Sequence, residues 1–280
     1  MKLLSFLSPL THEKTWGCVK NDNVYDLKKQ LGDNYPDLKS AISNNILSEL
    51  KQLKLEYPDY PLNEIHFLPV IDNPNKIICV GMNYPEKRKE FEQSTNAPTL
   101  FIRFPDSLVA HNEFMHKPNS TNEFDYEGEL AVIIGKTTSN VSKEIALEHV
   151  AGYSCFMDGS VRDMQYTWFT SGKNWPKTGG FGPWLVTSDE ITDPQKLHIT
   201  TSLNGLQVQS ESTGNMIYSI SYLIEYISRF SKLEAGDVII TGSPGGVGKK
   251  RTPPLFMKEG DIIEVEISQI GKLKNKILDC

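Results

Sequence analysis

The sequence predicts a β-dominated α+β protein, with a small N-terminal α/β domain over residues 1–72 and a large β-rich domain over residues 73–280. Three observations support this class. Short apolar runs rich in β-branched residues dominate the chain after residue 76. Helical periodicity is confined to a few segments, so helices and strands do not alternate as they would in a βαβ fold. A proline-rich stretch, Glu56–Asn75, lies between the two regions and has the character of a linker.

Two strand candidates open the N-terminal region. The first is Lys2–Leu7, and the second is Thr15–Val19, which is expected to form a hairpin with Val24–Leu27. A helix is expected next over Tyr35–Tyr57, because apolar residues recur there at spacings of three and four. These elements predict a small α/β unit, and the linker places its boundary near Asn73.

The remaining chain is expected to be rich in strands. Apolar, β-branched runs predict strands over Lys76–Val80, Pro98–Arg103, Leu130–Ile134, Lys196–Leu203, Val238–Thr241 and Ile262–Ile267. Two helices are expected in this region. Ser142–His149 would begin with Ser142 as its N-cap, and Ile217–Phe230 aligns isoleucines on one face.

Composition and charge argue against several classes of protein. The 280 residues carry a formal net charge of −6 and a pI near 5.6, which argues against nucleic acid as the main partner. No apolar run approaches the roughly 20 residues that span a bilayer, so no membrane partner is expected. The four cysteines are scattered without a CxxC pair, which argues against a disulfide framework or a zinc site. The N-terminus reads as a strand and not as a signal peptide, so the predicted location is cytoplasmic.

The most informative segment is an acidic strand candidate, Phe124–Ile134. Side chains two apart on a strand share a face, so Asp125, Glu127 and Glu129 are expected to project to one side. Three like charges at that spacing repel one another, and a hard divalent cation with its preference for oxygen ligands would relieve the repulsion. The alternative is a solvated face of an edge strand. This segment alone does not choose between the two.

A second acidic position strengthens the case for a metal. Asp158 follows a short apolar strand and precedes a glycine, where a carboxylate can stand at the rim of a sheet. Arg162 and Gln165 follow at spacings of four and three, so one helical turn would bring them to the same side as Asp158. An arginine in that place can hold a substrate carboxylate in a bidentate pair.

These motifs together resemble the fumarylacetoacetate hydrolase family. Asp-Tyr-Glu-Gly-Glu-Leu-Ala at 125–131 is similar to that family's metal-binding strand, and Met-Asp-Gly-Ser-Val-Arg-Asp-Met-Gln at 157–165 is similar to its second signature. Four further motifs occur in the family's order: Cys79-Val-Gly-Met-Asn-Tyr84, Gly172-Lys-Asn, Gly182-Pro-Trp-Leu-Val-Thr187 and Thr241-Gly-Ser-Pro-Gly-Gly-Val-Gly248. The resemblance covers roughly residues 76–272.

The resemblance implies a fold, a cofactor and a set of site residues. The fold would be the family's mixed β-roll or sandwich, usually a homodimer, and the cofactor Mg²⁺, or else Mn²⁺ or Ca²⁺. The metal ligands would be Glu127, Glu129 and Asp158. The substrate-binding residues would be Arg162, Gln165, Thr241 and Gly242, and Lys173 would be a catalytic lysine near the metal.

One position departs from the family pattern. Hydrolytic members carry a histidine and a glutamate after the Asn-Tyr pair, and here Lys87 stands in the place of the histidine, while Glu90 is present. A lysine with an ordinary pKa near 10.4 is a poor general base at neutral pH. Three explanations stay open: Lys87 has a lowered pKa, His111 or His116 substitutes for the histidine, or the chemistry needs no such base.

The predicted function is that of a divalent-metal enzyme acting on a small oxo acid. The resemblance favours hydrolytic C–C cleavage of an acylpyruvate or fumarylpyruvate, in which a metal would take up the charge of the developing enolate. The alternatives are an oxo-acid decarboxylase, an isomerase of the 2-hydroxyhepta-2,4-diene-1,7-dioate type, and a catalytically weakened ligand-binding protein. The substitution at Lys87 favours the last of these, and the three carboxylates favour an enzyme.

Overall fold

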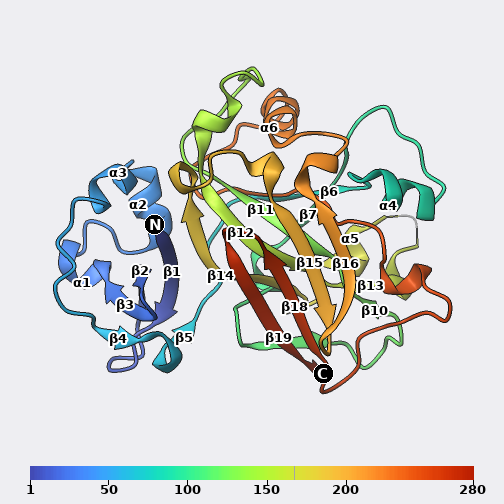
Figure 1. Ribbon diagram of the computed structural model, residues 1–280, viewed down its shortest axis with the longest axis horizontal. Coiled ribbons are helices and arrows are strands. Elements are labelled where there is room, and N and C mark those ends of the chain that lie inside the picture. Colours follow the sequence, from blue (N-terminus) through green and yellow to red (C-terminus); the bar gives the residue numbers. More distant parts are fainter. Residues whose placement is uncertain (167) are drawn as a thin grey trace.

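The computed structural model describes residues 1–166 and 168–280. Within these residues three β-sheets form most of the regular structure, and the helices are short (Figure 1). The predicted β-dominated α+β class is therefore confirmed.

The largest sheet has 12 strands. In spatial order its path contains β4 (Tyr60–Pro61), β3 (Asn23–Asp26), β2 (Lys14–Lys20), β1 (Lys2–Leu7), β14 (Gly179–Thr187), β12 (Val150–Asp158), β11 (Gly128–Ile134), β17 (Val238–Ile240), β6 (Ile77–Gly81) and β7 (Thr99–Arg103). Two strands lie off this path, β5 (His66–Phe67) beside β1 and β8 (Leu108–Val109) beside β14. Strands β11 and β12 are buried along their whole length, which explains their nearly continuous apolar sequences.

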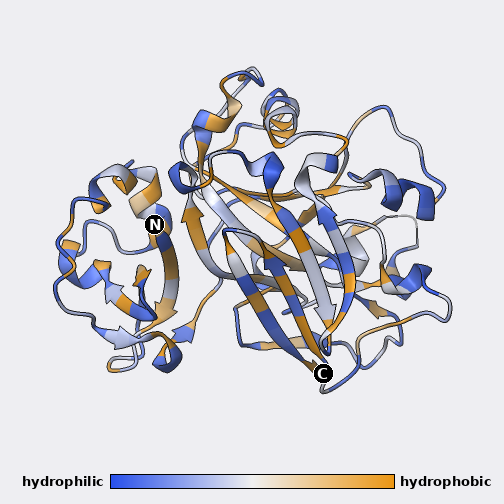
Figure 2. Cartoon of the chain, in the orientation of Figure 1, coloured by the Kyte–Doolittle hydropathy of each residue, from blue (hydrophilic) through white to orange (hydrophobic). Residues whose placement is uncertain are grey.

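A second sheet packs against the first and completes a sandwich (Figure 1). Its five strands are β16 (Leu206–Ser212), β15 (His198–Leu203), β18 (Ile262–Ile267), β19 (Gly271–Asp279) and β9 (Phe114–Lys117). Hydrophilic and hydrophobic residues alternate along β18 and β19, as expected for strands with one buried face (Figure 2). A small third sheet pairs β10 (Phe124–Asp125) with β13 (Ser160–Val161).

The helices are shorter than the sequence predicted, and six α-helices occur in the described residues where three were expected. The α-helices are α1 (Leu27–Leu31), α2 (Leu38–Ser43), α3 (Leu47–Leu50), α4 (Pro85–Glu90), α5 (Thr170–Lys173) and α6 (Ile220–Ser228). The 3₁₀ segments are Leu62–Glu64, Pro105–Ser107, Ala146–His149, Arg162–Met164, Ser188–Glu190, Pro194–Lys196, Thr213–Asn215 and Gly248–Lys250.

Each of the three predicted helices needs correction. The helix expected over Tyr35–Tyr57 is divided into α2 and α3, because Asn45 adopts a positive φ of 58° that an α-helix does not allow. The helix expected over Ser142–His149 is only a 3₁₀ turn at its C-terminal end, so Ser142 does not cap it. The last predicted helix begins later than expected, because the hydroxyl of Ser219 caps the helix by accepting from the backbone N–H of Tyr222.

The N-terminal region is joined to the large sheet. Strand β1 pairs with β14 through Lys2 opposite Val186 and Leu3 opposite Leu185. One apolar cluster contains residues from both regions, including Leu3 and Trp16 on one side and Leu185 on the other. The division at residues 72 and 73 thus stays a prediction. No helix in the described part of the chain is long and apolar enough to cross a membrane.

Candidate metal centre

Three carboxylates converge where β11 and β12 meet. Glu127 lies in the two-residue gap between β10 and β11, Glu129 lies on β11, and Asp158 ends β12. The antiparallel pairing of these strands brings the residues together, and the N–H of Asp158 donates to the carbonyl of Glu127 at 2.8 Å. One carboxylate oxygen from each residue lies within 4.8 Å of the others, and all three side chains are buried.

Asp125 does not join this cluster, contrary to the expected alternation. The two residues between β10 and β11 belong to neither strand, so the continuous strand that would give Asp125, Glu127 and Glu129 a shared face is interrupted. The Asp125 carboxylate instead accepts from the backbone N–H groups of Gly248, at 2.7 Å, and Lys249, at 3.1 Å. Asp125 therefore fixes the segment 241–250, the glycine-rich loop, beside the site.

Lys173, from α5, lies between two of the carboxylates. Its Nζ is 2.5 Å from Glu127 Oε2 and also donates to the carboxylate of Asp158. Burial disfavours the ammonium form, but the negative charges of Asp158 and Glu127 outweigh burial and raise the pKa of Lys173. Lys173 is consequently a permanent cation at neutral pH.

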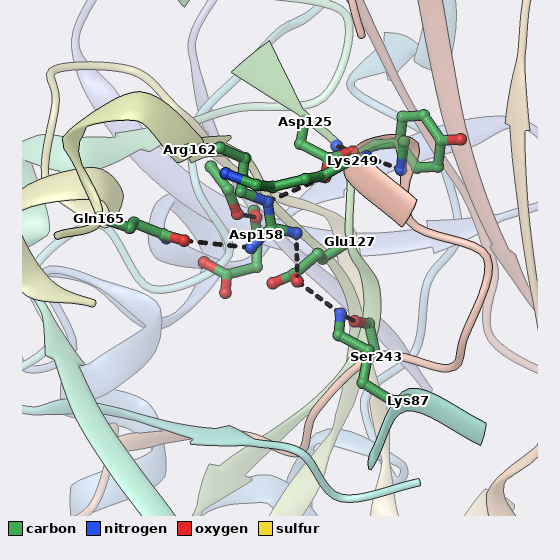
Figure 3. A network of polar contacts seen from close by, with 12 residues as sticks. Lys87, Asp125, Glu127, Asp158, Arg162, Gln165, Ser243 and Lys249 are labelled. Atoms are coloured by element: carbon green, nitrogen blue, oxygen red, sulfur yellow. Dashed lines mark hydrogen bonds and ion pairs between the residues drawn. The ribbon is translucent and has the colours of Figure 1, made fainter. Parts of the chain in front are cut away.

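Lys87 extends from α4 toward Glu127 (Figure 3). Its Nζ is 2.5 Å from Glu127 Oε1 and 2.7 Å from the hydroxyl oxygen of Ser243. Burial lowers the pKa of Lys87 below its ordinary value, although the neighbouring charge of Glu127 opposes the change. This direction agrees with the first of the three explanations considered for the missing histidine.

Glu90 has a different partner from Lys87. Its Oε1 accepts from the backbone N–H of Gly246 at 2.7 Å, while Lys87 is bonded to Glu127 and Ser243. The two residues therefore do not form the paired arrangement that the family pattern suggested. Glu90 instead ties α4 to the glycine-rich loop.

Arg162 is surrounded by polar partners (Figure 3). Its Nε donates to Asp125 at 2.8 Å, one terminal nitrogen donates to Glu127 at 2.6 Å, and the other donates to Gln165 Oε1 at 3.2 Å. The predicted helical turn is confirmed for Arg162 and Gln165, which a 3₁₀ turn joins, but it does not include Asp158, because strand β13 (Ser160–Val161) lies between. The guanidinium already serves two carboxylates, which leaves it poorly placed for a third.

Arg103 is a site residue that the sequence reasoning missed. It comes from β7, at the end of the largest sheet, and only 2% of its surface is exposed. Its terminal nitrogens donate to Asp158 Oδ1 at 2.6 Å and to the hydroxyl oxygen of Thr178 at 2.7 Å. An arginine at the end of an otherwise apolar strand was the signal that could have identified it, because a buried guanidinium requires a carboxylate partner.

The predicted ligand-binding positions Thr241 and Gly242 support β11 and the cluster. The hydroxyl of Thr241 donates to the carbonyl of Leu130 at 3.0 Å, so it links two parts of the chain and does not face the cavity. The N–H of Gly242 donates to Glu129 Oε2 at 2.6 Å. Gly242 has a φ of +98°, and a Cβ there would lie 2.9 Å from that of Asn83, so the position requires glycine.

Glu129 is the carboxylate of the cluster with no lysine or arginine bonded to it among the described residues. Burial raises the pKa of Glu129 well above its ordinary value, and the charges of Asp158 and Glu127 raise it further. Without a bound cation, Glu129 therefore keeps its proton to a higher pH than an exposed glutamate does.

This arrangement fits a divalent cation. Three carboxylates supply the hard oxygen ligands that Mg²⁺, Mn²⁺ and Ca²⁺ prefer, and such an ion would take the place of the proton on Glu129, which has no cationic partner among the described residues. A small cavity of about 20 Å³ adjoins Glu127, Glu129, Lys87 and Lys173. This volume holds one water molecule or one ion, and not an oxo acid.

The two histidines proposed as substitutes lie elsewhere. His111 accepts from the backbone N–H of Lys274 at 3.1 Å, and its ring packs against Phe67 of β5. His116 lies on β9, in the second sheet, where its backbone pairs with Leu278. Both are therefore part of the sandwich and not of the carboxylate cluster.

Comparisons with known proteins agree with these features. Residues 76–278 match the family described as fumarylacetoacetate (FAA) hydrolase C-terminal. Oxaloacetate tautomerase YisK of Bacillus subtilis is 41% identical over 225 residues, which cover 78% of this chain and 75% of that protein. Human mitochondrial oxaloacetate tautomerase FAHD2A is 38% identical over 235 residues, which cover 81% of this chain and 74% of that protein.

Solved structures show the same fold over the whole chain. Fumarylacetoacetate hydrolase from Exiguobacterium antarcticum superimposes with a TM-score of 0.89 and 33% identity, covering 100% of both chains. Maleylpyruvate hydrolase from Sphingobium sp. SYK-6, in complex with manganese(II) ion and pyruvate, gives a TM-score of 0.81 and 26% identity, covering 100% of this chain and 99% of that one. The chain belongs to the fumarylacetoacetate hydrolase family.

Proposed function

We propose that this protein is a divalent-metal-dependent tautomerase that interconverts the enol and keto forms of oxaloacetate or a similar four-carbon oxo diacid. The observation that carries the proposal is the charge of the buried site. Four buried carboxylates face four buried cations: Asp125, Glu127, Glu129 and Asp158 against Lys87, Arg103, Arg162 and Lys173. A bound dication would leave a surplus of two positive charges, which a substrate with two carboxylates neutralises.

The relatives support the same choice. YisK and FAHD2A are both named as oxaloacetate tautomerases and share 41% and 38% identity with this chain. The charge of the site favours oxaloacetate, a dianion, over acylpyruvates with a single carboxylate. This proposal replaces hydrolytic cleavage, the reaction favoured from the sequence alone, with one of its alternatives.

The protein groups suit a reaction that only moves protons. In enol-to-keto conversion the enol oxygen loses a proton and the neighbouring carbon gains one, so no water is consumed. A bound divalent cation would act as an electrophile that draws negative charge toward the substrate oxygens. Lys173, cationic beside Asp158 and Glu127, would stabilise negative charge on the same oxygens. Lys87 is the amine we assign to proton transfer, because it adjoins the cavity and also contacts the hydroxyl of Ser243.

Hydrolysis is less well supported by the same geometry. Hydrolysis requires a group that activates water, and Lys87 and Glu90 are bonded to separate partners. The maleylpyruvate hydrolase shares the fold at 26% identity. Hydrolysis and decarboxylation are therefore outcomes that the functional test must distinguish.

The test measures three reactions on the same preparation. Enol-rich oxaloacetate is diluted into buffer with Mg²⁺- or Mn²⁺-loaded protein, and the loss of ultraviolet enol absorbance is recorded. Pyruvate release, measured with a coupled dehydrogenase, reports decarboxylation, and the loss of acylpyruvate absorbance reports hydrolysis. We expect accelerated enol loss that a chelator abolishes, with little pyruvate release. If cleavage of acylpyruvates or pyruvate release is faster than enol loss, the tautomerase proposal is wrong.

A further inference from the structure

Outside the buried cluster, the glycine-rich loop brings an exposed lysine close to the site. Each buried cation of the site already has a carboxylate partner: Lys87, Arg103, Arg162 and Lys173. Lys250, at the end of the 3₁₀ segment Gly248–Lys250, has no carboxylate partner among the described residues. Its neighbour Lys249 is paired with Glu123 at 3.1 Å. Lys250 is thus a free cation next to the site.

The backbone around Lys250 is fixed. The N–H groups of Gly248 and Lys249 both donate to Asp125, and the side chain of Arg251 donates to the hydroxyl oxygen of Tyr126 at 2.8 Å. Residues on both sides of Lys250 are therefore anchored to the segment that precedes β11. A loop held in this way presents its lysine from a defined position, which lowers the entropy lost when a ligand binds.

The ammonium of Lys250 rests on an aromatic ring that also faces the site. Its Nζ is 4.7 Å from the ring centre of Phe91, while Lys87 Nζ is 5.7 Å and Arg162 Cζ 5.9 Å from the same ring centre. Phe91 follows α4 directly and caps its C-terminus. Lys250 and the two site cations Lys87 and Arg162 therefore all lie near the ring of Phe91.

The cavity is too small for a four-carbon acid, so a substrate can enter only if groups around it move. Phe91 does not line this cavity, but its ring lies against Lys87 and Arg162, which do, so a substrate that extends beyond the cavity on that side would meet the ring. Lys250 is exposed and lies against the same ring. Its ammonium has no carboxylate partner among the described residues, so it is available to the outer end of such a substrate.

We propose that Lys250 binds the distal carboxylate of the oxo diacid and selects diacids over monoacids. This inference rests on the proposed function. The α-oxo acid end of the substrate would lie toward the three carboxylates, where the metal is expected, and the other end would reach Lys250. A charge-assisted hydrogen bond of this kind contributes about a tenfold difference in affinity.

The test compares two substrates that differ only in the distal group, oxaloacetate and its 4-ethyl ester. In Lys250→Met we expect the KM for oxaloacetate to rise about tenfold, with kcat nearly unchanged and no change for the ester. Lys250→Arg should restore most of the discrimination because it keeps the charge. Lys258→Met, which removes one exposed lysine from the loop before β18, is the matched control and should behave as the unaltered protein.

Binding of the two compounds to the Mn²⁺-loaded protein, measured by calorimetry, separates this inference from the tautomerase proposal. If neither compound is turned over but Lys250→Met still weakens oxaloacetate binding alone, the reaction is wrong and the role of Lys250 stands. If Lys250→Met weakens the binding of the diacid and the ester equally, or of neither, Lys250 does not bind the distal carboxylate. Unchanged thermal unfolding of the variant shows that it is folded.

Discussion

Glu129 differs from the other two carboxylates of the cluster because only a backbone N–H, that of Gly242, is bonded to it in the described structure. Its raised pKa means that the metal-free native state holds a proton that the unfolded chain loses near pH 4.5. Between pH 4.5 and the raised pKa the native state binds more protons, so stability falls as the pH rises. A dication competes with that proton, so metal affinity falls when the pH is lowered.

Replacing Glu129 by glutamine tests this account. Without metal at pH 8, Glu129→Gln is expected to raise the unfolding midpoint by at least roughly 2 °C, because glutamine is buried without taking up the proton that Glu129 must bind on folding. The same variant should lose the stabilisation that Mn²⁺ gives to the unaltered protein, which thermal unfolding with and without metal measures. Glu259→Gln, an exposed replacement of the same kind, is the control. A destabilised Glu129→Gln protein that still responds fully to Mn²⁺ would contradict the assignment.

Lys87 is expected to matter for turnover more than for metal binding. Lys87→Arg keeps a positive charge near Glu127 but cannot give up its proton at neutral pH. We expect a decrease in kcat of about 10²–10⁴-fold, with Mn²⁺ affinity changed by less than about threefold. Lys89→Arg on the same helix is exposed and should be neutral. Kinetics and metal titration on both variants decide the matter, and full activity in Lys87→Arg would exclude a proton-transfer role.

The cysteines give a prediction that is independent of the site. Burial raises the pKa of Cys18 to about 11 and that of Cys155 to about 12, and Cys79 is raised well above its ordinary value, mainly by burial. Cys280 is exposed. At pH 8 a thiol with a pKa of 11 is about one part in a thousand thiolate. Native protein should therefore react at one thiol with a disulfide reagent and at four after denaturation, and Cys280→Ser should remove the fast reaction.

At the scale of elements, strand β7 contributes a buried positive charge to the site through its last residue, Arg103. Arg103 bonds to Asp158 and Thr178, so Arg103→Met leaves buried polar atoms without their partner. Removing one partner of a buried ion pair costs about 3–5 kcal/mol. We expect a loss of that size in chemical denaturation. Arg229→Met, which breaks an exposed pair with Glu225, should cost less than about 1 kcal/mol, and equal losses would show that Arg103 is no more important than a surface arginine.

The elements also show what the sequence could and could not predict. Strands such as β6, β15 and β18 were predicted correctly, because the buried face of a strand leaves a period-two pattern or an apolar run in the sequence itself. The predicted helix lengths were wrong because a single residue in the left-handed conformation, such as Asn45, ends a helix although the apolar periodicity of the sequence continues past it. The convergence of Glu127 and Glu129 follows from local spacing. Arg103 was missed because its partner Asp158 is 55 residues away, and pairing across strands leaves no local pattern.

At the scale of the whole molecule, the N-terminal region and the site share one sheet. Leu3 is fully buried and lies opposite Leu185 of β14, which in turn pairs with β12, the strand that carries Asp158. Leu3→Ala is therefore expected to cost about 2–5 kcal/mol. Unfolding followed by circular dichroism and by Mn²⁺ release should shift together in this variant.

A surface replacement in the same region provides the control. Leu10 is 81% exposed, so Leu10→Ala should leave both transitions within about 0.5 kcal/mol of the unaltered protein. If Leu3→Ala lowers only a first, separate transition and metal release stays where it was, residues 1–72 unfold as an independent domain. The predicted homodimer and the predicted cytoplasmic location stay predictions, and light scattering coupled to chromatography would measure the first.

The short helix α4 has a consequence for how ligands reach the site. Lys87 and Glu90 stand on the same turn, one bonded to Glu127 and the other to Gly246, so the helix cannot tilt away from one partner without straining the other. If α4 moves as one unit to admit a ligand, both bonds break in the same step, and the entry of the ligand then has a rate of its own. At high ligand concentration, association measured by stopped flow should then reach a plateau set by that event and independent of how much ligand is present.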